Sequence, residues 1–396
     1  MIGQRIKALR KEKKLTQSQL AEGIITKSML SMIENGKAEA SMRSLRELAK
    51  RLDVSVQSLL VDPREIELQA LVEEIEYADL TLSPWSEEAT KQALSPYLTT
   101  EMNSIWQGKA YVIMGDNLKH VDKRSELLAY YDKAIKLFER LDEKDELAMA
   151  LVGKAYYHIL WNQFEEASEQ LDRLELLDVR NMSSRTRIEY AMFLVMKELT
   201  YEGNLAGAIH HLDDALQYMH QTRTYYRADD IYRTIALCSL YLKDEQRINE
   251  AFVKARQYIQ FTDDHVAKIR LALSEALYAI HYRHVEQLGQ RIEEMERLLA
   301  GDYPFIAAIE MSKGVYHAMK GEIEDGNRAF KRLWEGMDGW KKHSLIDQAV
   351  YFEGVLIGAS YGCGMDLVPS IQEDVQKFPE GFYRTHLTEL LQKIKG

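Results

Sequence analysis

Residues 16–37 read TQSQLAEGIITKSMLSMIENGK and contain the strongest motif in the chain. Thr16 and Thr26 each stand where a side-chain hydroxyl can cap the first turn of a helix. Apolar residues recur three and four positions apart after each threonine, and Asn35-Gly36 follows the second run as a stop signal. The stretch therefore predicts two short helices joined by a turn.

Further helices are predicted on both sides of this pair. Ile6 and Leu9 share one face of a helix that precedes it. Ser41 or Ser44 begins a fourth helix, and a fifth ends near Leu60. The central pair covers about residues 17–22 and 27–34, which gives a bundle of five helices. We expect its core to contain Ile6, Leu9, Leu20, Ala21, Leu30, Ile33, Leu45, Leu48, Ala49 and Leu52.

Charge divides the chain at the end of this bundle. The 396 residues have a formal net charge of −11, but residues 1–62 carry 12 Lys and Arg against 7 Asp and Glu. The remaining residues carry 39 basic and 55 acidic side chains. A small positive module can approach phosphate groups, whereas an acidic body is repelled from them. Residues 1–62 are therefore assigned to a domain of their own.

Residues 63–85 are predicted to form a linker helix, which Asp62-Pro63 begins and Leu82-Ser83-Pro84 breaks. Its apolar positions are Ile66, Leu71, Ile75 and Leu80.

Residues 86–396 form a predicted string of helical hairpins. A small residue recurs early in the second helix of four pairs, at Ala167, Ala208, Ala251 and Gly326. The first three lie 41 and 43 residues apart. A degenerate hairpin covers about 264–300, and an earlier one is indicated near Ala134. Because a period near 40 residues is typical of an α-solenoid, the fold class is all-α: a five-helix bundle followed by a solenoid.

The ordered motif of residues 16–45 closely resembles the xenobiotic-response-element (XRE) class of helix-turn-helix, the type found in the lambda and 434 phage repressors. The resemblance covers residues 2–61 and implies a domain whose third helix enters the major groove of double-stranded DNA. The sequence departs from the common pattern at Ile24-Ile25, which follow Gly23 in the turn, and at Ala40, where proline is frequent. Neither departure threatens the fold.

The resemblance also assigns roles to single residues. Lys27, Ser28 and Met32 are the implied base-reading positions: Lys27 can donate to guanine, Ser28 to several bases, and Met32 can contact a thymine methyl group. Gln17 begins the second helix, where a phosphate is favoured. The complete expected DNA-binding set is Gln17, Thr26, Lys27, Ser28, Met32, Asn35, Lys37 and Arg43. The alternative interpretation is a small bundle that docks another protein.

The hairpins resemble tetratricopeptide repeats. An XRE-type domain, a linker helix and such repeats together resemble the RRNPP quorum-sensing receptors of Gram-positive bacteria. This resemblance implies a homodimer that binds a short, re-imported signalling peptide in the groove of the repeats and moves its DNA-binding domains in response. Asparagines commonly clamp the peptide backbone in that family, and Asn162 and Asn204 lie near predicted helix ends.

Solenoids of helical hairpins present a concave surface that is lined mainly by the first helix of each pair. Aromatic faces with mixed charges on that surface suit an extended peptide, Lys154 and Lys313 favouring a carboxylate and Glu198 and Glu275 an amine. Tyr156 and Tyr316 are expected to pack between repeats instead. Alignment on the small residues gives the expected peptide-binding set Lys154, Tyr157, Glu198, Tyr241, Glu275, Tyr278, Lys313 and His317.

The sequence predicts no enzyme, cofactor or metal site. It contains no phosphate-binding glycine loop, no GxSxG elbow and no HExxH pair. His210-His211 is interpreted as a surface pair, and Cys238 and Cys363 as buried free thiols in a reducing cytoplasm. No apolar stretch is long enough for a membrane helix or a secretory signal, so a cytoplasmic protein is expected.

Two other functions remain open for the repeats. They could bind or dephosphorylate a response-regulator protein, as some members of the resembled family do. They could also serve only to dimerise the chain, with no peptide ligand.

Overall fold

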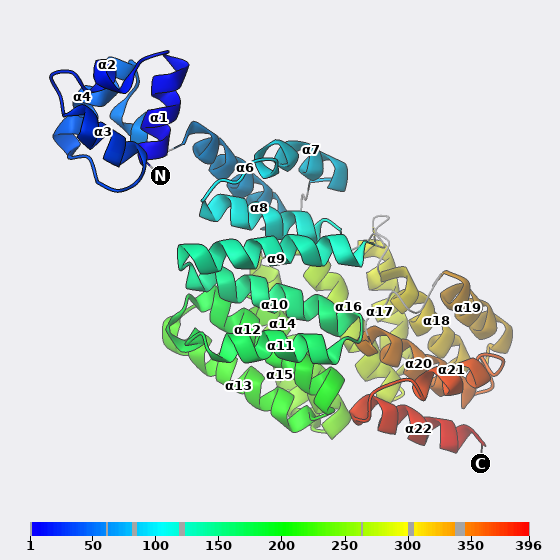
Figure 1. Cartoon of the computed structure of the whole chain (residues 1–396). Coiled ribbons are helices and arrows are strands. Elements are labelled where there is room, and N and C mark those ends of the chain that lie inside the picture. Colours follow the sequence, from blue (N-terminus) through cyan, green and yellow to red (C-terminus); the bar gives the residue numbers. More distant parts are fainter. Residues whose placement is uncertain are drawn as a thin grey trace. The chain divides into compact units, whose positions relative to one another are not determined.

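The computed structural model describes residues 2–60, 62–80, 85–118, 123–262, 264–299, 305–336 and 345–395. Within these ranges every regular element is helical, which confirms the predicted all-α class (Figure 1). The chain divides into two compact units, Met1–Glu143 and Lys144–Gly396. The predicted break at Leu82-Ser83-Pro84 lies outside the described residues.

The first unit begins with the five predicted helices. Thr16 caps the second of them: its hydroxyl accepts a hydrogen bond from the Gln19 backbone N–H at 3.2 Å, and the Gln19 side chain accepts one from the Thr16 N–H at 2.8 Å. Ser41 rather than Ser44 caps the fourth. The bounds are α1 (Ile2–Glu12), α2 (Gln17–Ala21), α3 (Lys27–Glu34), α4 (Met42–Leu52) and α5 (Val56–Leu60).

The apolar faces of α1 to α5 meet in one core. Ile6, Leu20, Leu30, Leu48 and Leu52 are fully buried there, while Leu9 is half-buried. Burial of each such side chain is worth roughly 1.5–3 kcal/mol relative to its exposure. The predicted core is therefore confirmed, and it keeps the remaining face of α3 at the surface.

The same unit continues with α6 (Pro63–Leu80), α7 (Glu87–Leu98), α8 (Ile105–Asp116) and α9 (Arg124–Leu141). The buried face of α6 consists of Leu68, Val72 and Ile75, spaced by four and three residues. Ile66 was expected inside but is 49% exposed, because it lies about 200° around the helix from Leu68. The side chain of Leu80 lies outside the described residues. Helices α8 and α9 form the early hairpin indicated by Ala134, which is buried.

The second unit consists of stacked hairpins (Figure 1). Their members are α10 (Lys144–Leu160) with α11 (Phe164–Glu175), α12 (Ser184–Lys197) with α13 (Leu205–Thr222), α14 (Ala228–Leu242) with α15 (Glu245–Thr262), α16 (His265–His281) with α17 (Val285–Leu298), and α18 (Ile306–Lys320) with α19 (Ile323–Gly336). A short 3-10 helix, η1 (Val179–Asn181), precedes α12, and a π-helical turn, η2 (Glu198–Glu202), extends it.

The small marker residues are buried where each second helix meets its partner. A Cβ atom on Gly326 would lie 2.7 Å from the Cys363 sulfur and 3.3 Å from the Gly314 carbonyl oxygen. Ala167, Ala208 and Ala251 are buried at the equivalent position. The predicted hairpins, including the degenerate one at 264–300, are therefore confirmed.

The end of the chain returns to the middle of this unit. After α20 (Leu345–Ala359) and α21 (Val368–Val375), helix α22 (Phe382–Lys395) packs on α20, α21 and η2. Gly203, at φ +61°, follows η2, and a Cβ atom there would lie 2.3 Å from the Phe382 nitrogen. Only glycine allows this backbone-to-backbone contact, which closes the stack of hairpins on itself.

Among the described residues, no helix combines the length and apolar content needed to span a bilayer.

Candidate DNA-binding and ligand-binding sites

Helix α3 presents the three implied base-reading residues to solvent. Lys27 and Ser28 are exposed, and Met32 is 40% exposed. Leu30 and Ile33 hold the opposite side of the helix in the core. The exposed face of α3 thus combines a cationic donor, a hydroxyl and an apolar thioether, which together can read base edges.

The other expected DNA contacts lie beside α3. Lys37 and Arg43 are exposed, and Asn35 forms the C-cap of α3. Thr26 is exposed and its hydroxyl caps α3 by accepting from the Met29 N–H at 3.1 Å. Gln17 differs, because its amide nitrogen donates to Glu34 Oε2 at 2.8 Å inside the bundle.

That internal contact belongs to a buried ion pair which sequence reasoning missed. Arg10 Nε and NH2 donate to the two carboxylate oxygens of Glu34 at 2.6 and 2.9 Å, and Arg10 NH1 donates to the Leu15 carbonyl at 2.8 Å. Burial raises the pKa of Glu34, but hydrogen bonds from Arg10 and Gln17 outweigh it and bring the net pKa below its ordinary value. The pair joins α1 to the C-terminal end of α3. It therefore fixes the orientation of the exposed face.

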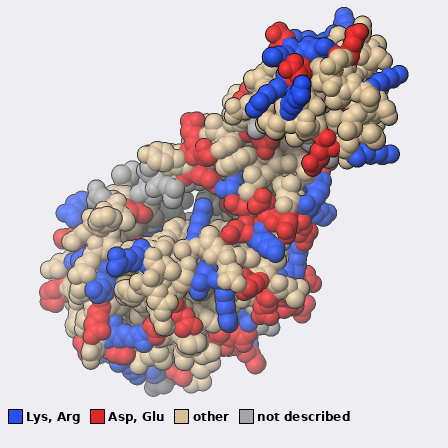
Figure 2. Space-filling model, turned by 90° about the vertical axis from the view of Figure 1, so that its left-hand side faces the viewer, with Lys and Arg blue, Asp and Glu red and all other residues tan. Residues whose placement is uncertain are grey.

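Lys and Arg side chains project from several sides of this bundle (Figure 2). Arg51 is also exposed, and its guanidinium donates to the backbone carbonyls of Gln19, Leu20 and Glu22 at the end of α2. This contact joins α4 to the end of α2, while Lys27, Lys37 and Arg43 remain exposed.

The expected peptide-binding residues of the first and last hairpins lie partly at the surface. Tyr157 is only 6% exposed and packs with Trp161, whereas Tyr156, expected to pack between repeats, is 42% exposed. Lys313 Nζ lies 2.6 Å from Glu296 and 3.4 Å from Glu310. His317 Nδ1 lies 2.6 Å from a Glu322 carboxylate oxygen.

Two of the expected peptide-binding residues, Glu275 and Tyr278 on α16, contact the second helices of their own or the preceding hairpin. Glu275 of α16 is buried and receives hydrogen bonds from Arg256 of α15 and Arg291 of α17. A cavity of about 930 Å³ lies over it, between these three helices. Tyr278 also faces α15, where its ring meets Phe252.

Tyr241 lies on a different side, beneath α22. Its hydroxyl donates to Glu353 Oε2 at 2.8 Å. The other oxygen of Glu353 accepts from His386 Nε2 of α22 at 2.5 Å and lies 3.0 Å from His281 Nε2. Burial, followed by the charge of Glu353, raises the pKa of Tyr241 well above its ordinary value. The structure therefore separates Tyr241 from Glu275 and Tyr278 instead of gathering them in one groove.

Glu198 begins the π-helical turn η2. Its Oε1 lies 3.6 Å from His211 Nε2, while its buried Oε2 has no hydrogen-bond partner among the described residues. Asn204 caps α13 through the Gly207 N–H, and Asn162 occupies a turn with φ +60°. The Asn204 side chain therefore serves the local backbone of α13.

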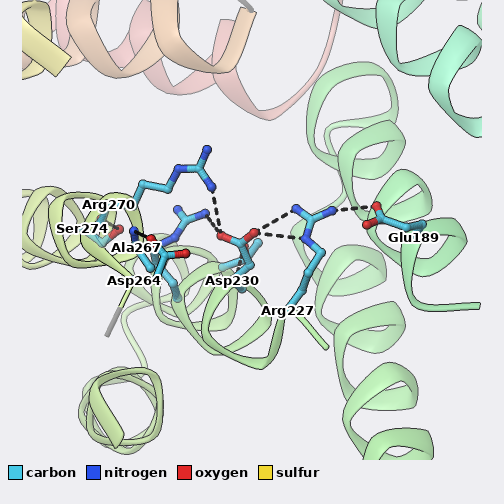
Figure 3. A network of polar contacts seen from close by, with 9 residues as sticks. Glu189, Arg227, Asp230, Asp264, Ala267, Arg270 and Ser274 are labelled. Atoms are coloured by element: carbon cyan, nitrogen blue, oxygen red, sulfur yellow. Dashed lines mark hydrogen bonds and ion pairs between the residues drawn. The ribbon is translucent and has the colours of Figure 1, made fainter. Parts of the chain in front are cut away.

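Sequence reasoning missed a charged network on α12, α14 and α16 (Figure 3). Asp230 lies at its centre and pairs with Arg227, Arg233 and Arg270. Arg227 NH1 also donates to Glu189 Oε2 at 2.7 Å. Arg227, Asp230 and Arg233 follow one another at intervals of three residues, a helical ion-pair spacing that could have indicated the network.

One group of described residues has metal-ligand proximity: His317, Glu322 and Asp325 place ligand atoms within 4.8 Å of one another. Lys320 Nζ lies 2.7 Å from Glu322, however, and Arg328 pairs with Asp325. These cations already neutralise the two carboxylates.

Comparisons with known proteins concern mainly the first unit. A helix-turn-helix family model matches residues 6–59. The regulator SinR of Bacillus subtilis is 48% identical over 69 residues, which are 17% of this chain and 62% of SinR. The immunity repressor of Bacillus phage phi105 is 43% identical over 60 residues, 15% of this chain and 42% of the repressor. SinR of Bacillus licheniformis is 37% identical over 100 residues, 25% of this chain and 89% of that protein.

Two solved structures align with more of the chain, but with low TM-scores and low sequence identity. Bacillus thuringiensis PlcR in complex with the peptide PapR7 and DNA is 19% identical, with a TM-score of 0.39 over 68% of this chain and 98% of PlcR. ComR from S. thermophilus in complex with DNA and its signalling peptide ComS is 13% identical, with a TM-score of 0.25 over 91% of this chain and 98% of ComR.

Three findings indicate the same type of domain. They are the bundle of α1 to α5, the exposed face of α3, and the match along 89% of Bacillus licheniformis SinR. The chain belongs to the helix-turn-helix transcriptional regulators and carries a DNA-binding domain of the XRE type.

Proposed function

We propose that this transcriptional regulator responds to a short peptide, bound on the surface that the first helices α12, α14 and α16 share. The observation that carries the proposal is the charged network on those helices, where Arg270 remains 48% exposed in its side chain. A half-exposed arginine on α16, next to the less exposed Arg233 of α14, offers a peptide a charged contact that dimerisation alone does not require. An extended peptide of roughly five to ten residues, rising about 3.3 Å per residue, would span several hairpins there.

Four of the residues expected from sequence keep the exposure that contact requires. We retain Lys154, Glu198, Lys313 and His317 as candidate peptide contacts, since each is half-buried. Tyr241 could touch a ligand only after α22 had moved, and Glu275 only after its arginine partners had moved. Tyr278 is buried against Phe252 of α15.

We also propose that the protein acts as a homodimer. One domain of about 60 residues covers a short half-site, and two of them on one face of the duplex need half-sites an integral number of helical turns apart. Light scattering would distinguish a dimer of about twice the 45.9 kDa chain mass from a monomer.

Replacement of Lys27 by alanine is expected to weaken binding to a cognate operator by about 1–3 kcal/mol, through the loss of a base contact. Lys37→Ala should instead weaken binding evenly across sequences and flatten the salt dependence, because a phosphate contact carries no base information. Fluorescence anisotropy with an operator selected from random duplexes measures both effects. Lys50→Ala is the matched control, since Lys50 is exposed on α4 and pairs with Glu47. If all three variants bound alike, the placement of α3 in the groove would be wrong.

Peptide control is tested by selecting heptapeptides that bind the full-length chain and measuring operator affinity with and without them. A ligand changes DNA affinity only if it prefers one arrangement of the DNA-binding domains. We expect a reciprocal coupling of about 1–3 kcal/mol, or roughly 5- to 150-fold. A scrambled peptide is the control. Selected peptides that leave operator affinity unchanged, or a selection that yields none, would refute the peptide-receptor function and leave the DNA-binding function intact.

A further inference from the structure

We propose that Arg233 and Arg270 form a carboxylate-binding site that takes the free C-terminal carboxylate of the bound peptide. The identity of the occupant rests on the proposed function, whereas the ability of the two arginines to hold a carboxylate does not. Arg233 comes from α14 and Arg270 from α16, so successive first helices each supply one guanidinium group.

The guanidinium groups of Arg233 and Arg270 both lie near the carboxylate of Asp230. The Asp230 side chain is only 10% exposed, and its Oδ1 accepts a hydrogen bond from Arg233 NH2 at 2.8 Å and lies 3.8 Å from Arg270 NH1. Its Oδ2 is used by Arg227, whose Nε and NH2 donate to it at 3.1 and 2.9 Å. In Figure 3 the Arg270 side chain reaches towards Asp230 from the side opposite Arg227.

The three arginines differ in how much of their hydrogen-bonding capacity is used. Arg227 is committed to Asp230 and Glu189 through three of its nitrogens. Arg233 donates only through NH2, and Arg270 makes only the longer 3.8 Å ion pair among the described residues. A guanidinium has five N–H donors in a planar fork, so these two keep most of theirs for a ligand.

The charges around Asp230 keep its carboxylate ionised. The guanidinium groups of Arg227, Arg233 and Arg270 face the carboxylates of Asp230 and Glu189. Asp229 also lies within the electrostatic influence of Arg233. Burial raises the pKa of Asp230, but the charges of Arg233 and Arg227 outweigh it and hold the net pKa well below its ordinary value. Asp230 therefore remains ionised and acts as a fixed anchor rather than as a proton donor.

Further hydrogen bonds hold the network around Asp230 in place. Glu189 Oε1 accepts a hydrogen bond from the Tyr226 hydroxyl at 2.6 Å, and burial with the charge of Glu189 raises the pKa of Tyr226 to about 12. The Thr234 hydroxyl donates to the Asp230 carbonyl at 2.7 Å. Paired guanidinium groups oriented in this way match the bidentate geometry of a carboxylate, at a reduced entropic cost of binding.

The position of the pair favours a peptide terminus. The C-terminal ends of α14 and α16 are covered by α22 through Tyr241 and His281, whereas Arg233 and Arg270 lie nearer their beginnings and remain accessible. Lys313, which sequence reasoning assigned to the carboxylate, is already paired with Glu296 and Glu310.

The first experiment compares two heptapeptide libraries, identical except that one ends in a free acid and the other in an amide. The full-length chain should enrich the free-acid library by about tenfold, equivalent to 1.4 kcal/mol. The double variant Arg233→Ala/Arg270→Ala should lose that preference. Lys254→Ala/Arg328→Ala, two exposed cations on α15 and α19, is the matched control and should keep it. Equal enrichment of both libraries, or of amidated peptides rich in Asp and Glu, would overturn the assignment to the terminus.

The second experiment probes the arginines without a peptide. N-acetylglycine should shift the ¹⁵Nε resonances of Arg233 and Arg270 in the full-length chain, and N-acetylglycinamide should not. Arg270→Lys keeps the charge and the fold but should weaken the response, because lysine lacks the bidentate fork. No shift, or tighter binding of inorganic phosphate than of N-acetylglycine, would overturn the carboxylate site. A shift without any peptide selected from either library would refute the peptide function alone.

Discussion

Replacement of Glu353 by alanine is expected to destabilise the second unit by about 3–5 kcal/mol, because it leaves buried polar groups without their acceptor. The carboxylate joins three helices to α20: Tyr241 of α14, His281 of α16 and His386 of α22 all lie within 3.0 Å of its oxygens. We expect α22 to separate from η2 and from Tyr241 in this variant.

Hydrogen exchange of peptides from α22, measured in the full-length chain, follows that separation directly. Glu389→Gln is the matched control, because Glu389 is an exposed carboxylate on α22. Burial raises the pKa of Glu353, but His281 and His386 outweigh it and the net pKa lies far below the ordinary 4.5. Because the pKa of Glu353 is lowered by folding, its ionised carboxylate stabilises the fold above pH 4.5. This contribution to the free energy of unfolding is lost as the pH falls through the pKa of the folded state. Unchanged exchange in α22 would show that Glu353 does not hold this helix.

Replacement of Glu34 by alanine is expected to lower the free energy of unfolding of the DNA-binding domain by about 3–5 kcal/mol, because Arg10 would remain buried without its partner. Gln17 would lose its acceptor in the same step. Because the Arg10–Glu34 pair orients α3 against α1, we expect operator binding to fall with stability.

The domain contains no Trp, Tyr or Phe in residues 1–60, so hydrogen exchange of its peptides is the appropriate measurement. Glu47→Ala removes an exposed carboxylate on α4 and should change stability by less than about 1 kcal/mol. Equal exchange rates in the Glu34 and Glu47 variants would contradict a structural role for the buried pair.

Local signals in the sequence were enough to predict the helices of the DNA-binding domain. The Thr16 and Thr26 caps depend on hydrogen bonds to backbone groups three residues away, and Gly36 ends α3 at φ +72°. Such interactions lie within one helical turn, so the order of neighbouring residues determines them. The exposed face of α3 follows from the same periodicity.

The sequence predicted the helical hairpins of the repeats, but it did not predict which side of each first helix is exposed to solvent. Marker residues such as Ala208 and Ala251 identify the close contact between two helices of a pair, and this contact was confirmed. They do not identify the side of the first helix that faces solvent. One residue of register error rotates a helical position by about 100°, enough to exchange Tyr157 with Tyr156.

Local sequence patterns were sufficient to predict the all-α class, the hairpin period, and the helix-turn-helix with its exposed Lys27, Ser28 and Met32. The tertiary fold selects the partners of buried polar and charged groups, because these contacts join residues that are distant in the chain: Tyr241 and Glu353 are 112 positions apart. It also decided the contact of Gly203 with Phe382 that returns α22 to the middle of the unit. A buried charge requires a partner, but packing selects that partner, and no local pattern records the choice.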